Sequence, residues 1–198
     1  MLRVDLIRHG QTGGNAEKRY VGRTDEPLCP EGILKLLQTA ERQKQGKSDP
    51  QLIFSSPMLR CIQTAKLLYP EGKIRVLEGL RETDFGSFEY KTYEELKDNR
   101  EYRAWIESAG TLPCPGGESM EDVKRRSLEA FEEAVRICTG EQLSHAAFVI
   151  HGGTIMGLLE TLGIPRKSGY DWMVSNGEGY SGWWNEEKHR IEIERKWP

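Results

Sequence analysis

The sequence predicts an α/β protein with a mostly parallel central sheet and helices on both faces. Segments with the apolar character of buried strands alternate along the chain with segments of helical periodicity. Such alternation is typical of strand–helix–strand units, whose crossovers make neighbouring strands parallel. No internal repeat or low-complexity stretch divides the 198 residues, and this length suits one domain with an ordinary core. We therefore expect a single domain over residues 1–198.

The first half of the chain supplies three strands and two helices. Strands are expected at residues 2–7, 52–54 and 73–77. A first helix opens at residues 30–32 and carries apolar residues at helical spacing, namely Ile33, Leu36, Leu37 and Ala40. A second helix follows the start signal at residues 55–57 and carries Leu59, Ile62, Ala65, Leu67 and Leu68.

The middle of the chain departs from this alternation. Residues 92–109 predict one charged helix, and its less polar side carries Tyr93, Leu96, Tyr102, Trp105 and Ile106. We expect residues 84–120 to form a helical insertion over one end of the sheet, above the active site.

The alternating pattern returns after residue 118. Ser119 and the acidic residue three positions later nearly match a capping box, which predicts the start of a long helix. A buried strand at residues 146–150 is followed by a helix at residues 154–162. Residues 179–197 predict two strands joined by a turn near Glu187.

Composition argues against several classes of protein. The formal net charge of −3 gives no sign of the basic surface that nucleic-acid binding needs. Four scattered cysteines form no CxxC pair, so neither a zinc site nor a disulfide framework is predicted. No stretch has the length of a membrane span, and the first residues lack the pattern of a signal peptide. We expect a cytoplasmic protein without nucleic-acid or membrane partners, as a monomer or homodimer.

Two histidines directly follow predicted strands. His9 comes after the strand at 2–7, His151 comes after the strand at 146–150, and each precedes a glycine. In parallel sheets the reactive groups gather at the carboxyl ends of strands, and glycine lets a ligand approach the backbone. Arginine binds phosphate bidentately, and a neutral imidazole is a nucleophile at neutral pH. The Arg8–His9 pair therefore predicts a phosphoryl-transfer site, although a hydrogen-bonded histidine at a strand end is the ordinary alternative.

Five stretches, in order, resemble the motifs of the histidine phosphatase superfamily, whose best-known members are the cofactor-dependent phosphoglycerate mutases. They are LIRHGQT at 6–12 followed by Asn15, SSPMLRCIQTA at 55–65, LRETDFGSFE at 80–89, PGGES at 115–119 and VIHGG at 149–153. One such motif is weak evidence, but five in order over residues 6–153 are specific.

The resemblance implies a reaction without metal or cofactor, on a small-molecule phosphate monoester. His9 would attack phosphorus and become phosphohistidine. The phosphoryl oxygens would be held by Arg8, Arg60 and His151, helped by Asn15 and the backbone amide of Gly152. These arginines and the histidine would supply the positive charge that a metal supplies elsewhere.

The resemblance also implies an acid and base. Glu82 would protonate the leaving oxygen and then take a proton from the attacking water. Two other acidic residues, Asp84 and Glu89, lie close to it in the sequence and stay open as alternative proton donors.

The substrate stays open between several subgroups. Residues 20–28 and 85–89 resemble α-ribazole-5′-phosphate phosphatases of cobalamin synthesis, which makes Gly22, Arg23 and Thr24 candidate substrate-binding residues. Broad-specificity sugar and organic phosphatases share this pattern. Phosphoglycerate mutases are longer and carry Arg-His-Tyr-Gly where this chain has Thr-Asp-Phe-Gly at residues 83–86, so we expect hydrolysis. A non-catalytic phosphate-binding module is a further alternative, although no catalytic residue of the motifs is missing.

Overall fold

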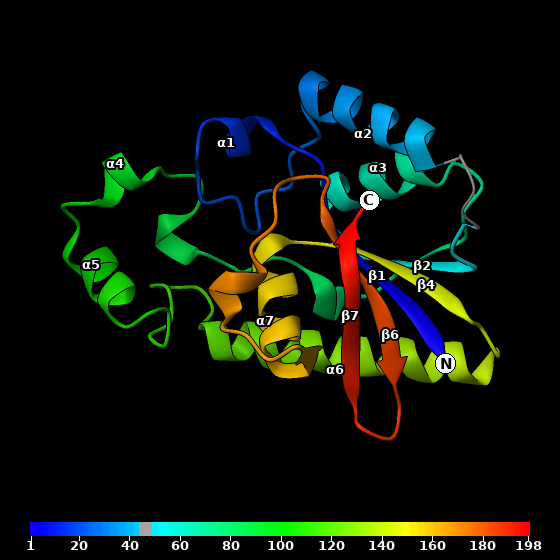
Figure 1. The fold of residues 1–198 in the computed structure, drawn as a ribbon. Helices are drawn as coiled ribbons and strands as arrows, with labels where there is room; N and C mark the ends of the chain where they lie inside the picture. Colours follow the sequence, from blue (N-terminus) through cyan, green and yellow to red (C-terminus); the bar gives the residue numbers. More distant parts are fainter. Residues whose placement is uncertain (44–48) are drawn as a thin grey trace.

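A central seven-stranded sheet organises the structure, a computed structural model that describes residues 1–43 and 49–198. Its strand order is β3-β2-β4-β1-β6-β7-β5 (Figure 1). The parallel part consists of β1 (Leu2–Arg8), β2 (Leu52–Ser55), β3 (Ile74–Val76) and β4 (His145–Ile150). The hairpin of β6 (Gly179–Asn185) and β7 (Arg190–Trp197) joins β1 in antiparallel fashion, and β5 (Gly163–Ile164) runs parallel to β7. The predicted mostly parallel sheet is confirmed.

Helices cover both faces of this sheet, as the sequence predicted. One layer holds α2 (Pro30–Gln43) and α3 (Leu59–Leu68), and the other holds α6 (Met120–Gly140) and α7 (Gly152–Leu162) (Figure 1). Successive strand residues point to opposite faces. Leu6 thus packs in one hydrophobic cluster with Phe131 of α6, while Ile7 packs in another with Leu36 of α2. This explains why the strands are apolar at nearly every position.

The expected single helix at residues 92–109 is wrong in one respect, because the structure has two helices there. These are α4 (Tyr93–Leu96) and α5 (Arg100–Glu107). The side chain of Asn99 accepts a hydrogen bond from the backbone N–H of Tyr102 at 3.0 Å, so it caps and starts a new helix. Apolar residues keep their spacing across the break, and periodicity alone therefore could not reveal it.

The inserted segment has a small core of its own. Buried Phe88, Leu96, Tyr102 and Cys114 pack together, and the rings of Tyr20, Phe85 and Trp105 lie against them. In Figure 1, α4 and α5 stand beside the sheet, apart from both helical layers. Short helical turns complete the chain: α1 (Gly13–Ala16), η1 (Glu78–Leu80), η2 (Gly86–Phe88) and η3 (Gly169–Trp172). Of the helices that the structure describes, none has both the length and the apolar composition to cross a membrane.

Phe148 ties the sheet to α6, and its truncation should be costly. Its buried ring lies 5.1 Å, between centroids, from the rings of both Phe54 and Phe131. We expect Phe148→Ala to lower the free energy of unfolding by about 3–5 kcal/mol, measured by urea denaturation, because the surrounding core cannot fill the cavity left by the ring. The exposed Leu34 of α2 offers a control, and Leu34→Ala should change stability by less than about 0.5 kcal/mol. Equal effects of the two substitutions would contradict this account.

Candidate active site

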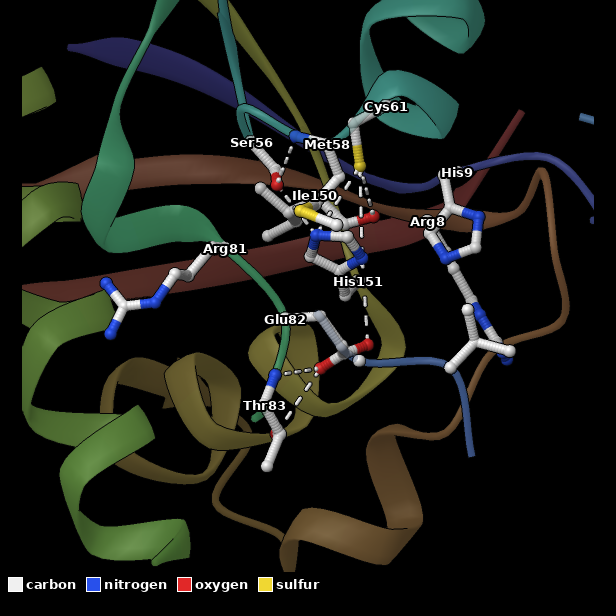
Figure 2. A network of polar contacts seen from close by, with 12 residues as sticks. Arg8, His9, Ser56, Met58, Cys61, Arg81, Glu82, Thr83, Ile150 and His151 are labelled. Carbon is white, nitrogen blue, oxygen red and sulfur yellow. Dashed lines mark hydrogen bonds and ion pairs between the residues drawn. The ribbon is translucent and has the colours of Figure 1, made fainter. Parts of the chain in front are cut away.

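The two histidines that follow β1 and β4 lie together at the carboxyl ends of these strands. Arg8 is paired in register with Ile150, so the next residues of both strands must meet. The ring centroids of His9 and His151 are 5.2 Å apart, edge to face, and both side chains are buried (Figure 2). The expectation that parallel pairing gathers both histidines at one site is confirmed.

His9 is held as a neutral imidazole. Its Nδ1 lies 2.7 Å from the carbonyl oxygen of Gly10, which can only accept. Nδ1 therefore carries the proton, and Nε2 keeps its lone pair. Burial lowers the pKa of His9 well below its ordinary value, and the positive charges of Arg60 and Arg8 lower it further.

His151 lies between a hydroxyl and a carboxyl group. Its Nε2 is 2.7 Å from Oγ of Ser56, and its Nδ1 is 3.6 Å from Oε2 of Glu82 (Figure 2). Burial lowers the pKa of His151 well below its ordinary value, with His9 as the next cause. The free site thus holds a neutral imidazole that can donate one hydrogen bond, and a bound phosphate dianion would favour its protonated form.

Glu82 is the acidic side chain that faces the histidines. Its Oε1 accepts a hydrogen bond from the backbone N–H of Thr83 at 2.9 Å. Burial raises the pKa of its carboxyl group, although that hydrogen bond and the nearby arginines oppose the rise. A carboxyl group with a raised pKa is suited to deliver a proton near neutral pH.

The two alternative acids are engaged elsewhere. Glu89 accepts hydrogen bonds from the backbone N–H groups of Gly22 and Thr24, at 2.9 and 2.8 Å. Asp84 accepts one from the backbone N–H of Gly86 at 2.8 Å. Both carboxylates therefore stabilise loops, which supports Glu82 as the proton donor.

Buried Arg60 and partly buried Arg8 supply positive charge. Arg60 of α3 donates to the carbonyl oxygens of Gly22 at 2.8 Å and Thr24 at 2.9 Å, and Arg8 donates to that of Val174 at 2.8 Å. Within the described part of the chain, Nε of each of these arginines is buried without a hydrogen-bond partner. Buried, unpaired guanidinium N–H groups are costly unless an anion binds to them. This donor set suits a phosphoryl group.

Gly152 lies next to Arg8, and Asn15 is linked through Asn176 to the backbone of His9. Oδ1 of Asn15 accepts a hydrogen bond from Nδ2 of Asn176 at 3.1 Å, and the same amide donates to the carbonyl oxygen of His9 at 3.2 Å. Gly152 is the first residue of α7, where a β-carbon would lie 3.3 Å from Cζ of Arg8. Asn176 has no motif around it, so no sequence pattern indicated its role.

The loop at residues 22–24 has a task that the sequence did not predict. The carbonyl groups of Gly22 and Thr24 hold Arg60, and a β-carbon on Gly22 would lie 2.0 Å from the carbonyl oxygen of Thr83. The mostly exposed side chain of Arg23 pairs with Asp84 at 3.4 Å. The backbone of this loop therefore positions Arg60, while direct substrate contact by Gly22, Arg23 and Thr24 stays a prediction.

Arg126 of α6 is a second residue that the sequence analysis missed. It donates to both carboxylate oxygens of Glu118 at 2.8 Å, and to the carbonyl oxygens of Arg81 at 2.7 Å and Glu82 at 3.0 Å. Arg126 thus holds the backbone that carries the acid. Glu118 belongs to the PGGES motif, but its partner could not be read from spacing.

A metal cluster was not predicted, and the described residues bring no three histidine, cysteine or acidic side chains together in a way that could hold a metal ion. That the reaction proceeds without a metal stays a prediction.

Comparisons with known proteins agree with this geometry. The model of the histidine phosphatase superfamily (branch 1) matches residues 4–193. "Probable phosphoglycerate mutase GpmB" of Salmonella paratyphi C (strain RKS4594) is 32% identical over 170 residues, which cover 83% of this chain and 77% of that protein. The protein of the same name from Proteus mirabilis (strain HI4320) is 34% identical over 172 residues, with the same coverage.

Solved structures share the fold over nearly the whole chain. The alpha-ribazole phosphatase from Shigella flexneri superposes with a TM-score of 0.83 at 22% identity, covering 98% of this chain and 95% of that one. At this identity the likeness concerns the fold alone. TTHB049 from Thermus thermophilus superposes with a TM-score of 0.75 at 28% identity, covering 100% of this chain and 99% of that one.

The protonation of His9 can be tested by NMR titration of its ring nitrogens. We expect the His9 imidazole to stay neutral, with its proton on Nδ1, at about pH 6. In Arg60→Gln the loss of one positive charge should raise the pKa of His9, yet leave it below the ordinary 6.5, because burial is the larger cause. A midpoint at or above 6.5 in the unmodified protein would contradict the neutral nucleophile.

Proposed function

Because the chain belongs to the histidine phosphatase superfamily, we propose that it is a phosphomonoesterase that works through a phosphohistidine on His9. One observation carries this proposal. A neutral imidazole lies near two guanidinium groups whose buried Nε–H donors have no partner among the described residues, and a carboxyl group with a raised pKa faces the same site. These are the nucleophile, the anion-binding donors and the acid that phosphoryl transfer requires.

In the first step, Nε2 of His9 attacks phosphorus and the bond from phosphorus to the alcohol oxygen breaks. Glu82 gives its proton to the departing oxygen, so a neutral alcohol leaves. The arginine N–H groups stabilise the charge on the phosphoryl oxygens, and this contribution is large because the site is buried.

In the second step, water attacks the phosphohistidine and the nitrogen–phosphorus bond breaks. Glu82, now ionised, takes a proton from the water, and inorganic phosphate leaves. His9 returns to its neutral form with its proton still on Nδ1. The same carboxyl group thus serves first as acid and then as base.

Hydrolysis is favoured over phosphoglycerate mutation by the cavity beside Glu82. A mutase must hold the carboxylate of its substrate, which needs unpaired positive charge. In the described part of the chain, the charged residues that line this cavity are Glu82, Lys124 and Glu160. Lys124 pairs with Glu160 at 3.2 Å, so its charge is already balanced.

The finer candidate is α-ribazole-5′-phosphate as the substrate. The two stretches that resemble its phosphatases supply Tyr20 and Phe85, whose ring centroids are 5.1 Å apart, and both line the same cavity. A broad-specificity organic phosphatase is the second candidate, since an apolar cavity also admits other ring-bearing esters.

The proposed activity is tested by phosphate release in the presence of EDTA. The panel contains α-ribazole-5′-phosphate, sugar phosphates, 3-phosphoglycerate and p-nitrophenyl phosphate. We expect His9→Ala to abolish release while circular dichroism shows an intact fold, and we expect EDTA not to inhibit. Full activity in His9→Ala would exclude the phosphohistidine route, and a preference for α-ribazole-5′-phosphate would support the finer candidate.

The role of Arg126 is tested by its effect on leaving groups. In Arg126→Lys the bidentate contacts are lost and Glu82 is less well placed. We expect kcat to fall about tenfold or more on an alkyl phosphate, whose leaving oxygen needs a proton, and much less on p-nitrophenyl phosphate.

Arg125→Lys is the matched control, because the neighbouring Arg125 is mostly exposed and pairs with Asp122 on the outer side of α6. It should change neither rate. Equal losses on both substrates in Arg126→Lys would indicate a general structural role instead of the positioning of the acid.

A further inference from the structure

We propose that the cavity beside Glu82 binds the alcohol part of the substrate and selects an uncharged, ring-bearing apolar group. This inference rests on the proposed function, and it adds the chemical class of the leaving group and the residues that choose it. Its walls come from the inserted segment, from α6 and from α7.

The position of the cavity follows from the chemistry of the first step. An acid must lie within hydrogen-bond reach of the leaving oxygen. Glu82 faces His151 on one side and lines the cavity on the other. The body of the alcohol therefore extends into this space of about 490 Å³, which lies in the usual range for small-molecule sites.

The walls are mainly apolar and aromatic. Residues with apolar or aromatic side chains along the cavity include Phe85, Trp105, Ile106, Met120, Val123 and Met156. Two lining residues remain largely open to solvent, since Ile106 is 49% exposed and Tyr170 is 70% exposed. A ring placed here would cover apolar surface that otherwise faces water, which is the main source of favourable binding energy.

Two buried hydroxyl groups lie along the cavity. Ser127 of α6 and Thr154 of α7 both line it, and each is 1% exposed. Neither hydroxyl has a hydrogen-bond partner in the part of the chain that the structure describes, and the same holds for Nε1 of Trp105. Ligand sites combine apolar walls with a few such polar groups, which orient the bound molecule.

Charge at the cavity disfavours ionised alcohols. The pair of Lys124 and Glu160 is neutral overall, so the described lining of the cavity offers no unpaired positive charge to a carboxylate. An uncharged alcohol therefore suits this cavity better than an anionic one.

Gly157 of α7 keeps the cavity open. A β-carbon at this position would meet only Cβ and Cγ of Lys124, both at the ordinary contact distance of 3.9 Å. A larger side chain can be accepted by the helix and would project into space that the ring needs. Gly157 is thus a specificity-determining position.

The test measures binding of two non-hydrolysable compounds by calorimetry, 2-phenylethylphosphonate and ethylphosphonate. They carry the same charged head and differ by one phenyl ring. In the unmodified protein we expect the phenyl compound to bind about 10- to 100-fold more tightly. Gly157→Leu should reduce this ratio to about two or less and leave the affinity for ethylphosphonate within about twofold.

Gly140→Leu is the matched control, since it makes the same change at an exposed glycine at the far end of α6, where a β-carbon would meet nothing within 4 Å. It should keep the full ratio. A ratio near one in the unmodified protein, or an unchanged ratio in Gly157→Leu, would overturn the inference. Because binding is measured without turnover, failure of phosphate release would count against the proposed function alone.

Discussion

The parallel pairing of β1 with β4 is the constraint on which the site depends. Arg8 lies opposite Ile150, and the backbone N–H of His9 continues the ladder by donating to the carbonyl oxygen of Ile150 at 2.9 Å. A shift of this register by one residue would turn every side chain of β1 to the opposite face. It would separate His9 from His151 and exchange the two hydrophobic clusters at the same time. Packing of the core and assembly of the site are therefore enforced by one set of hydrogen bonds.

Burial then prepares the groups that this pairing brings together. The same removal from water lowers the pKa of His9 and raises that of Glu82, which favours a neutral imidazole and a protonated carboxyl group. Opposite shifts of this kind mark the division between nucleophile and acid. Positive charge from Arg8 and Arg60 reinforces the first shift and opposes the second. The carbonyl groups of Gly22 and Thr24 accept hydrogen bonds from Arg60 and so offset part of the desolvation penalty of its buried charge.

The inserted segment connects this charged site to an apolar one. Glu118 lies near the end of the insertion, and through Arg126 it holds the backbone around Glu82. Trp105 and Phe85 of the insertion also form a wall of the cavity that Glu82 borders. Glu82 thus lies between His151 and this cavity. The insertion shapes the cavity, whereas the histidines are positioned by the sheet.

The local sequence pattern was sufficient to predict the mostly parallel sheet, both helical layers and the two histidines at strand ends. Apolar periodicity indicates the strands and helices, and their alternation along the chain indicates parallel pairing. The sequence pattern also identified Glu82, but only through resemblance, and it left Asp84 and Glu89 as alternatives. Tertiary structure favours Glu82 over Glu89, since Glu89 accepts hydrogen bonds from Gly22 and Thr24, which lie 67 and 65 residues away in the chain. It likewise revealed the break before α5, the clamp of Arg126 and the contact of Asn176. Arg126 and Asn176 contact partners that are distant in the chain and are brought near by folding, whereas Asn99 caps α5 locally. None of these contacts leaves a periodic trace in a sequence.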